Sequence, residues 1–255
     1  NKFLSWARQL EPIDESNLKE QKLVFKILGT LCIYQNKGIR KYQYLINKAL
    51  FEKQLSLVEF QTVKEHQCVH FKNKGNNPTL EKLYQTGVTY IPLSEVSLHK
   101  NLVDYLSSLL WLLRNLCLSG FKPGIQNVKR LNLDFEFLFW SLQDANIHIK
   151  LRKLFLSLIR VMYLELNKPN KCYFWDTQKR VLVKTQLKDS FLSSFVNWVE
   201  ACWTQNSLFS ASDSSVHKAD FAAELITTTK ALLKSNVEYE SFMSVCPSIL
   251  ELINP

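Results

Sequence analysis

Three observations predict an all-α fold, an armadillo-like helical solenoid of antiparallel amphipathic helices. Only 6 glycines and 7 prolines occur among the 255 residues, and so few turn residues favour long helices over many short strands. Apolar residues recur at three- and four-residue steps through most of the sequence, which is the period of a helix with one buried face. A Leu-rich helix end also occurs twice, at a separation that suits a helical repeat.

Apolar periodicity predicts four helices in the first third of the chain. The first has Leu23, Ile27 and Leu28 on its apolar face, and Asp14 or Ser16 can cap its start. The Gly, Pro and Asn residues of segment 73–78 predict a loop, because these residue types stop helices. The four helices are expected at residues 17–33, 39–52, 54–71 and 80–84.

The strongest helical pattern covers residues 94–118. Its stripe of apolar side chains, which includes Leu98, Leu109 and Leu116, is wide enough for a helix that is buried on several sides. The turn at residues 120–124 ends it, and the short connections that follow predict antiparallel neighbours. The later helices are expected at 125–131, 134–144, 147–166, 189–205, 216–235 and 238–253.

A self-similarity in the sequence predicts the repeat architecture. The segment 28–33, followed by a loop and Gly38-Ile39, resembles the segment 113–118, followed by a loop and Gly124-Ile125, 85 or 86 residues later. Two armadillo repeats of about 40 to 47 residues each occupy that length. Chance likeness of two Leu-rich helices is the alternative. We therefore expect one continuous solenoid, with N-terminal helical repeats in residues 1–72, a loop or insertion in 73–93, and C-terminal helical repeats in 94–255.

Charge and cysteine usage limit the possible environments and partners. The six cysteines contain no Cys-x-x-Cys pair, so we expect reduced thiols in the cytosol. The apolar stretches fall well short of the roughly 20 residues of a membrane span, so no membrane insertion is expected. The net charge of +9 is spread along the chain without a nucleic-acid-binding module, so we expect no nucleic acid. The absence of an initiator Met before Asn1 suggests a piece of a longer protein.

No motif for catalysis or metal binding is visible. The sequence lacks the signatures of hydrolases, kinases, nucleotide-binding proteins and zinc proteases. Asp213, Ser214 and His217 have the residue types of a catalytic triad, but helix capping explains them better. His66, Cys68 and His70 do not share one helix face. We therefore expect no enzyme, no cofactor and no metal.

Two groups of residues are candidates for binding. Lys37, Arg40 and Lys41 lie at the start of a predicted helix, where basic side chains add to the attraction of the helix dipole for an anion. A solvated helix face is the alternative. The aromatic residues Tyr173, Phe174 and Trp175 are a candidate partner interface, because exposed aromatic side chains concentrate at interfaces. The alternative is a loop held to the core by its rings.

The segment 28–46, from Leu28-Gly29-Thr30-Leu31-Cys32 to Gln43-Tyr44-Leu45-Ile46, resembles the cytosolic helical homology region of inositol trisphosphate receptors and ryanodine receptors. The likeness continues through residues 109–118, 133–142 and 149–166 and ends near Trp175. In the family a Tyr-Arg-Lys run followed by Gln contributes phosphate contacts. Arg40, Lys41 and Gln43 match it, but Ile39 replaces the Tyr, and the other basic ligands have no counterpart. Independent binding of inositol trisphosphate is therefore not expected.

This resemblance implies a non-enzymatic segment of a ligand-gated calcium-release channel. Such a segment relays conformational change through contacts with other domains or subunits of the same channel, which is expected to be a homo-tetramer. Its expected location is the cytosolic face of the endoplasmic reticulum or a related calcium store. The main alternative is an armadillo or HEAT-type scaffold that binds an acidic partner, for which the charge of +9 would serve directly. A second alternative is an enzyme with an unrecognised helical active site.

Overall fold

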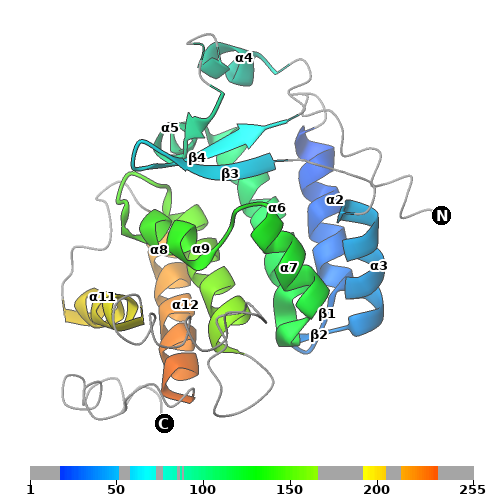
Figure 1. The fold of residues 1–255 in the computed structure, drawn as a ribbon, viewed down its shortest axis with the longest axis vertical. Coiled ribbons are helices and arrows are strands. Elements are labelled where there is room, and N and C mark those ends of the chain that lie inside the picture. Colours follow the sequence, from blue (N-terminus) through cyan, green and yellow to red (C-terminus); the bar gives the residue numbers. More distant parts are fainter. Residues whose placement is uncertain are drawn as a thin grey trace.

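The computed structural model describes residues 18–51, 58–72, 77–84, 87, 89–165, 192–204 and 214–234. These residues are mostly helical and include two small antiparallel sheets (Figure 1). The prediction of a mostly helical chain is therefore confirmed. The α-helices are α2 (Leu18–Leu31), α3 (Arg40–Phe51), α4 (Pro78–Tyr84), α5 (Leu93–Ser97), α6 (Lys100–Cys117), α7 (Lys122–Arg130), α8 (Phe135–Gln143), α9 (Ile149–Ile159), α11 (Leu192–Thr204) and α12 (Ser215–Lys234).

The prediction of a helix over residues 54–71 is wrong. Strands β3 (Val58–Val63) and β4 (His66–Phe71) form an antiparallel hairpin there, and β5 (Ile91–Pro92) pairs with β4. Lys64 and Glu65 make the turn with φ of 48° and 68°, as a tight hairpin turn requires. A short run of apolar residues fits the helical and the strand period equally well. Contacts with the rest of the chain select the strands.

These contacts come from aromatic rings that the hairpin directs into the core. Phe60 and Phe71 are fully buried. The ring of Phe60 lies 5.5 Å from that of Phe137 in α8, and the ring of Phe71 lies 6.2 Å from that of Tyr105 in α6. The Phe60 amide also donates to the Leu131 carbonyl. The hairpin therefore covers one end of the helices, and this sheet corrects the expectation of a purely α-helical chain.

Four helices form a row in which each packs on the next. α2 packs on α6, α6 on α9, and α9 on α12. On another side of this row α3 packs against α7, and α8 against α9 (Figure 1). The interior between the helices is filled by side chains such as Phe25, Leu116, Phe155, Leu158 and Phe221, all nearly inaccessible to solvent. Among the described residues, α2, α6, α9 and α12 share one concave face.

Two long predicted helices are interrupted in the structure. The helix expected over 94–118 is divided into α5 and α6, because His99 between them has an extended backbone, with φ of −112° and ψ of 98°. Leu98, which the pattern placed on the buried stripe, is 79 % exposed. The helix expected over 147–166 consists of α9 and a π-helical turn, η2 (Arg160–Leu164). The helix expected over 238–253 lies outside the described residues.

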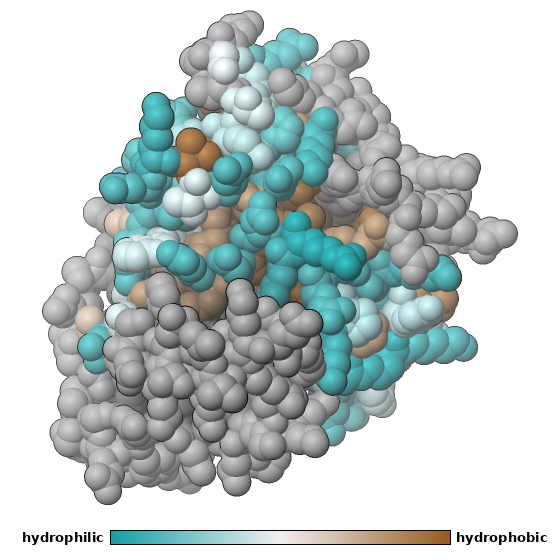
Figure 2. Space-filling view, viewed as in Figure 1, coloured by the Kyte–Doolittle hydropathy of each residue, from teal (hydrophilic) through white to brown (hydrophobic). Residues whose placement is uncertain are grey.

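The apolar face of α2 is narrower than its sequence pattern. Phe25 and Leu28 are buried, whereas Leu23 is 57 % and Ile27 38 % exposed. On the face seen in Figure 2, hydrophilic residues cover much of the described surface and apolar residues show between them. Among the described helices, none combines the length and the apolar composition that crossing a bilayer requires.

The two self-similar segments are in direct contact. α2 and α6 pack side by side, and Asn115 donates through Nδ2 to the Gly29 carbonyl at 3.4 Å. Gly29 permits this approach, because a Cβ atom there would lie 2.3 Å from the Trp111 ring. After α2 the chain turns through β1 (Ile33–Tyr34) and β2 (Lys37–Gly38) into α3, and after α6 through the 3₁₀ turn η1 (Leu118–Gly120) into α7. Two helix–turn–helix units thus lie next to each other.

Gln43 joins these two units. Its side chain is fully buried. Its Nε2 donates to two carbonyl oxygens in the last turn of α6, Asn115 at 2.9 Å and Leu116 at 3.4 Å, and to that of Leu118, just after the helix, at 3.1 Å. The last carbonyl groups of a helix have no partner within the helix. A side chain from α3 therefore provides the C-terminal cap of α6.

We expect Gln43→Ala to lower the free energy of unfolding by about 1 to 3 kcal/mol, because it leaves buried carbonyl groups without a donor. Urea unfolding followed by circular dichroism measures this effect. Tyr44→Ala is the control, since Tyr44 is 52 % exposed, and a change within about 0.5 kcal/mol is expected for it. Equal midpoints for the two variants would contradict the capping role.

Buried thiol and phenol groups predict a loss of stability at alkaline pH. Burial raises the pKa of the Cys32 thiol from 9.0 to about 12, and it also raises the pKa values of Cys117, Tyr105 and Tyr163. At a pH between the ordinary and the raised pKa, the unfolded chain has lost these protons, whereas the folded chain retains them. Because the unfolded state then binds fewer protons, its formation becomes more favourable as pH rises.

The free energy of unfolding is therefore expected to decrease above pH 9 by about 1 kcal/mol per buried thiol and pH unit. Urea midpoints recorded between pH 7 and pH 10.5 measure the slope. Replacement of Cys32 by Ala should reduce the slope, and an unchanged slope would contradict the assignment to this thiol.

Candidate functional site

The basic residues predicted as an anion site lie at the turn between β2 and α3. Lys37 is in β2, and Arg40 and Lys41 begin α3, all with exposed side chains. Arg40 donates through Nη2 to the carbonyl of Ser119, and its guanidinium lies 5.4 Å from the centre of the Phe121 ring. Arg40 thus connects the first helix–turn–helix unit to the second. Anion binding by these three residues stays a prediction.

The aromatic residues predicted as a partner interface, Tyr173, Phe174 and Trp175, lie outside the described residues.

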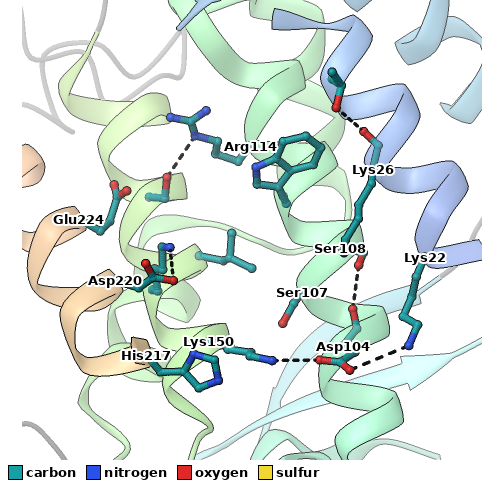
Figure 3. Close-up of a pocket in the computed structure, with 15 residues that line it drawn as sticks. Lys22, Lys26, Asp104, Ser107, Ser108, Arg114, Lys150, His217, Asp220 and Glu224 are labelled. Atoms are coloured by element: carbon teal, nitrogen blue, oxygen red, sulfur yellow. Dashed lines mark hydrogen bonds and ion pairs between the residues drawn. The ribbon is translucent and has the colours of Figure 1, made fainter. Parts of the chain in front are cut away.

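A groove of about 790 Å³ lies along the concave face that the helix row presents among the described residues. Its walls come from four helices, with Lys22 and Lys26 on α2, Lys150 and Lys153 on α9, and His217 and Asp220 on α12. Residues of α6 between Asp104 and Arg114 form its floor (Figure 3). Concave surfaces across stacked helices are the usual binding surfaces of helical repeat proteins. This groove, which we call the charged groove, is the candidate functional site.

Basic side chains outnumber acidic ones in the charged groove. Its lining contains five basic residues, Lys22, Lys26, Arg114, Lys150 and Lys153, and three acidic residues, Asp104, Asp220 and Glu224. With neutral histidine this leaves a local charge of +2, since 5 − 3 = 2. Such a surplus within a concave surface attracts anions.

The acidic residues of the charged groove are paired. Asp104 lies between two lysines from opposite walls, 3.1 Å from Nζ of Lys150 and 3.9 Å from Nζ of Lys22 (Figure 3). Asp220 lies 3.2 Å from Nζ of Lys153. These pairs are partly exposed, so each contributes at most about 1 kcal/mol to stability.

A more deeply buried ion cluster lies beside the charged groove. Arg160 in η2 is 4 % exposed. It donates from Nε to Glu224 of α12 at 2.7 Å, and from Nη1 to Glu165. Burial lowers the pKa of Arg160, but the two carboxylates outweigh this effect and hold the pKa above its usual value. The cluster connects the end of α9 to α12.

Arg114 of α6 has a different environment. Its guanidinium donates to two neutral groups, the Ser157 hydroxyl at 3.2 Å and the Asn115 side-chain carbonyl at 2.8 Å. Burial and the neighbouring charge of Arg160 lower the pKa of Arg114. Within the described part of the chain no carboxylate forms an ion pair with Arg114, and none does so with Lys26.

Of the residues that line the charged groove, His217 stood out in the sequence as a candidate for chemistry, among the triad-type residues that helix capping explains better. The basic residues of the groove did not stand out. A signal was present, because Lys22 and Lys26 are four residues apart and Lys150 and Lys153 three apart, so each pair shares a helix face. Such pairs are common on solvated helices. Only the packing of α2, α6 and α9 shows that they face one groove.

The sequence matches no model of a known protein family, and a search of curated proteins finds no similar sequence.

Proposed function

We propose that this chain is a non-enzymatic helical segment of an intracellular calcium-release channel of the inositol trisphosphate and ryanodine receptor type. In this proposal it is an armadillo-like solenoid on the cytosolic face of the endoplasmic reticulum or a related calcium store. Its partners are other domains or subunits of the same homo-tetrameric channel. Its role is to relay conformational change between them.

One observation carries this proposal. The segments in which the sequence resembles the channel family, 28–46 and 109–118, belong to two helix–turn–helix units that pack directly against each other. Gln43, one of the residues of the resemblance, caps the helix end in the second unit. The residues that carry the resemblance therefore make specific buried contacts. These contacts favour a repeated unit over a chance likeness.

The contacts also suit a mechanical role. The row α2, α6, α9 and α12 is held by buried apolar side chains, and close-packed interiors transmit displacement because they compress little. In this proposal a displacement of α2 is passed to α12 through the packed helices α6 and α9. This is the behaviour that a relay between a ligand-binding part and a distant pore needs.

Calcium release from stores tests the proposal. The gene for the protein is disrupted in the cells that make it, and store calcium is followed in permeabilised cells after addition of inositol trisphosphate or caffeine. We expect the response to be lost and to return with the unchanged gene. A response of normal size in cells without the protein would refute the proposal.

A scaffold for an acidic partner is the second candidate function. The charged groove favours it, because five basic residues and three acidic residues line one concave surface. A scaffold of this kind needs no pore and no other domain of a channel. Binding of an acidic partner together with normal calcium release in the disrupted cells would favour this alternative.

A further inference from the structure

The charged groove carries an inference that deepens the second candidate function, on which it rests, by naming the ligand and the residues that bind it. Three of its basic residues are already engaged by carboxylates of the chain, Lys22 and Lys150 by Asp104, and Lys153 by Asp220. The third carboxylate, Glu224, is engaged by Arg160. Two basic residues therefore form no ion pair with a carboxylate among the described residues, Lys26 on the wall and Arg114 on the floor. Glu224 and Glu165 attract Arg114 only from beyond ion-pair distance, and Arg160 engages both of them.

The partial burial of the Arg114 guanidinium without an ion pair costs free energy. A cation removed from water requires compensation by an anion or by several hydrogen-bond acceptors. Arg114 is partly buried and has two neutral acceptors, Ser157 and Asn115. An anion placed beside Arg114 and Lys26 would add a close negative charge to the longer-range attraction of Glu224 and Glu165.

The positions of the basic side chains favour an extended ligand. Along α6 the groove extends from Asp104, where Lys22 and Lys150 meet, to Arg114 (Figure 3). Ten residues of helix correspond to about 15 Å at 1.5 Å per residue. A single phosphate group needs several donors at one point, whereas these cations are distributed along both walls. The arrangement suits several carboxylates in succession.

The chain itself shows how a carboxylate is held there. Asp104 bridges the lysines of α2 and α9 across the groove. Lysine presents its charge as a compact, rotatable ammonium group, which accepts carboxylates from different directions. Acidic side chains of a bound segment can therefore be held in the same manner as Asp104.

We propose that the charged groove binds an acidic polypeptide segment, whose carboxylates pair with Lys26 and Arg114 and extend toward the pair of lysines at Asp104. The binding depends on electrostatic complementarity, so it weakens as salt is added. It does not require membership of the channel family, and its test is independent of calcium release.

A fluorescein-labelled poly-glutamate peptide is the probe, and fluorescence anisotropy with the purified chain measures its binding at low and at physiological salt. The decisive variant is Lys26→Glu, since Lys26 is exposed and its replacement leaves the core unchanged. The matched control is Lys82→Glu, which makes the same charge change at an exposed site on α4, outside the groove. Circular dichroism establishes that both variants are folded.

We expect Lys26→Glu to weaken binding about tenfold and Lys82→Glu to change it less than about twofold. Carbodiimide coupling of the bound peptide, followed by mass spectrometry, should place cross-links at Lys22 or Lys26 and not at Lys82. Absence of binding, or equal weakening by both variants, would overturn the proposal. Unlabelled poly-glutamate peptide is the reference competitor. If pyrophosphate or inositol hexakisphosphate displaced the labelled peptide at a lower concentration than this competitor does, the proposal would also be overturned, and the groove would be assigned to small phosphorylated anions.

Discussion

Arg160→Met is expected to lower the free energy of unfolding by about 3 to 5 kcal/mol. The substitution removes the cation from a buried cluster and leaves Glu224, whose side chain is 12 % exposed, without its partner at 2.7 Å. A buried carboxylate without a partner is strongly unfavourable, whereas a buried pair contributes little by comparison with apolar residues of similar size. Urea unfolding at neutral pH measures the change.

Two further variants test whether the loss of stability comes from the unpaired buried carboxylate or would follow from breaking any ion pair. Lys153→Met breaks the pair with Asp220, whose side chain is 54 % exposed, and the expected change is below about 1 kcal/mol. Combining Arg160→Met with Glu224→Leu should recover part of the stability, because the more deeply buried of the two carboxylates is then gone and only Glu165, whose side chain is 36 % exposed, has lost its partner. A double variant less stable than Arg160→Met alone would contradict this explanation.

Leu116→Ala and Leu158→Ala are each expected to lower the free energy of unfolding by about 2 to 5 kcal/mol. Leu116 belongs to α6 and Leu158 to α9, and both are 0 % exposed. Each substitution removes apolar contacts and leaves a cavity between helices that cannot fully collapse. Thermal and urea midpoints measure the effect.

Leu98→Ala is the control for the core substitutions. It makes the same chemical change at a residue that is 79 % exposed, so the expected change is within about 0.5 kcal/mol. If Leu98→Ala were as destabilising as Leu116→Ala, the assignment of buried faces in α5 and α6 would be wrong.

Several helix boundaries follow from local signals in the sequence. The helix predicted over 134–144 is observed as α8, Phe135–Gln143, and Asp134 caps it by accepting from the Phe137 amide at 2.9 Å. The helices predicted over 39–52 and 216–235 are observed as α3 and α12. Capping residues and apolar periodicity lie within a few residues of the helix that they define, so the sequence alone is sufficient to locate it.

The candidate site, in contrast, does not follow from local signals in the sequence. Lys26 and Arg114 are separated by 88 residues, since 114 − 26 = 88, and neither belongs to a motif. Arg114 lies in the Leu-rich segment 109–118, and nothing in the pattern of that segment marks it as a binding residue. Its role depends on Ser157 of α9 and on the nearby Arg160, which the fold brings together.

The sequence by itself determined that this chain is mostly helical, where several of its helices begin and end, and that two Leu-rich segments resemble each other. These features depend on interactions between residues that are near in the chain. The tertiary structure alone decided that Val58–Phe71 forms strands, that the two similar segments pack together, and that basic residues of α2, α6 and α9 share one groove. The physical reason is that burial and charge pairing are set by neighbours in space, and the periodicity of a short segment does not specify those neighbours.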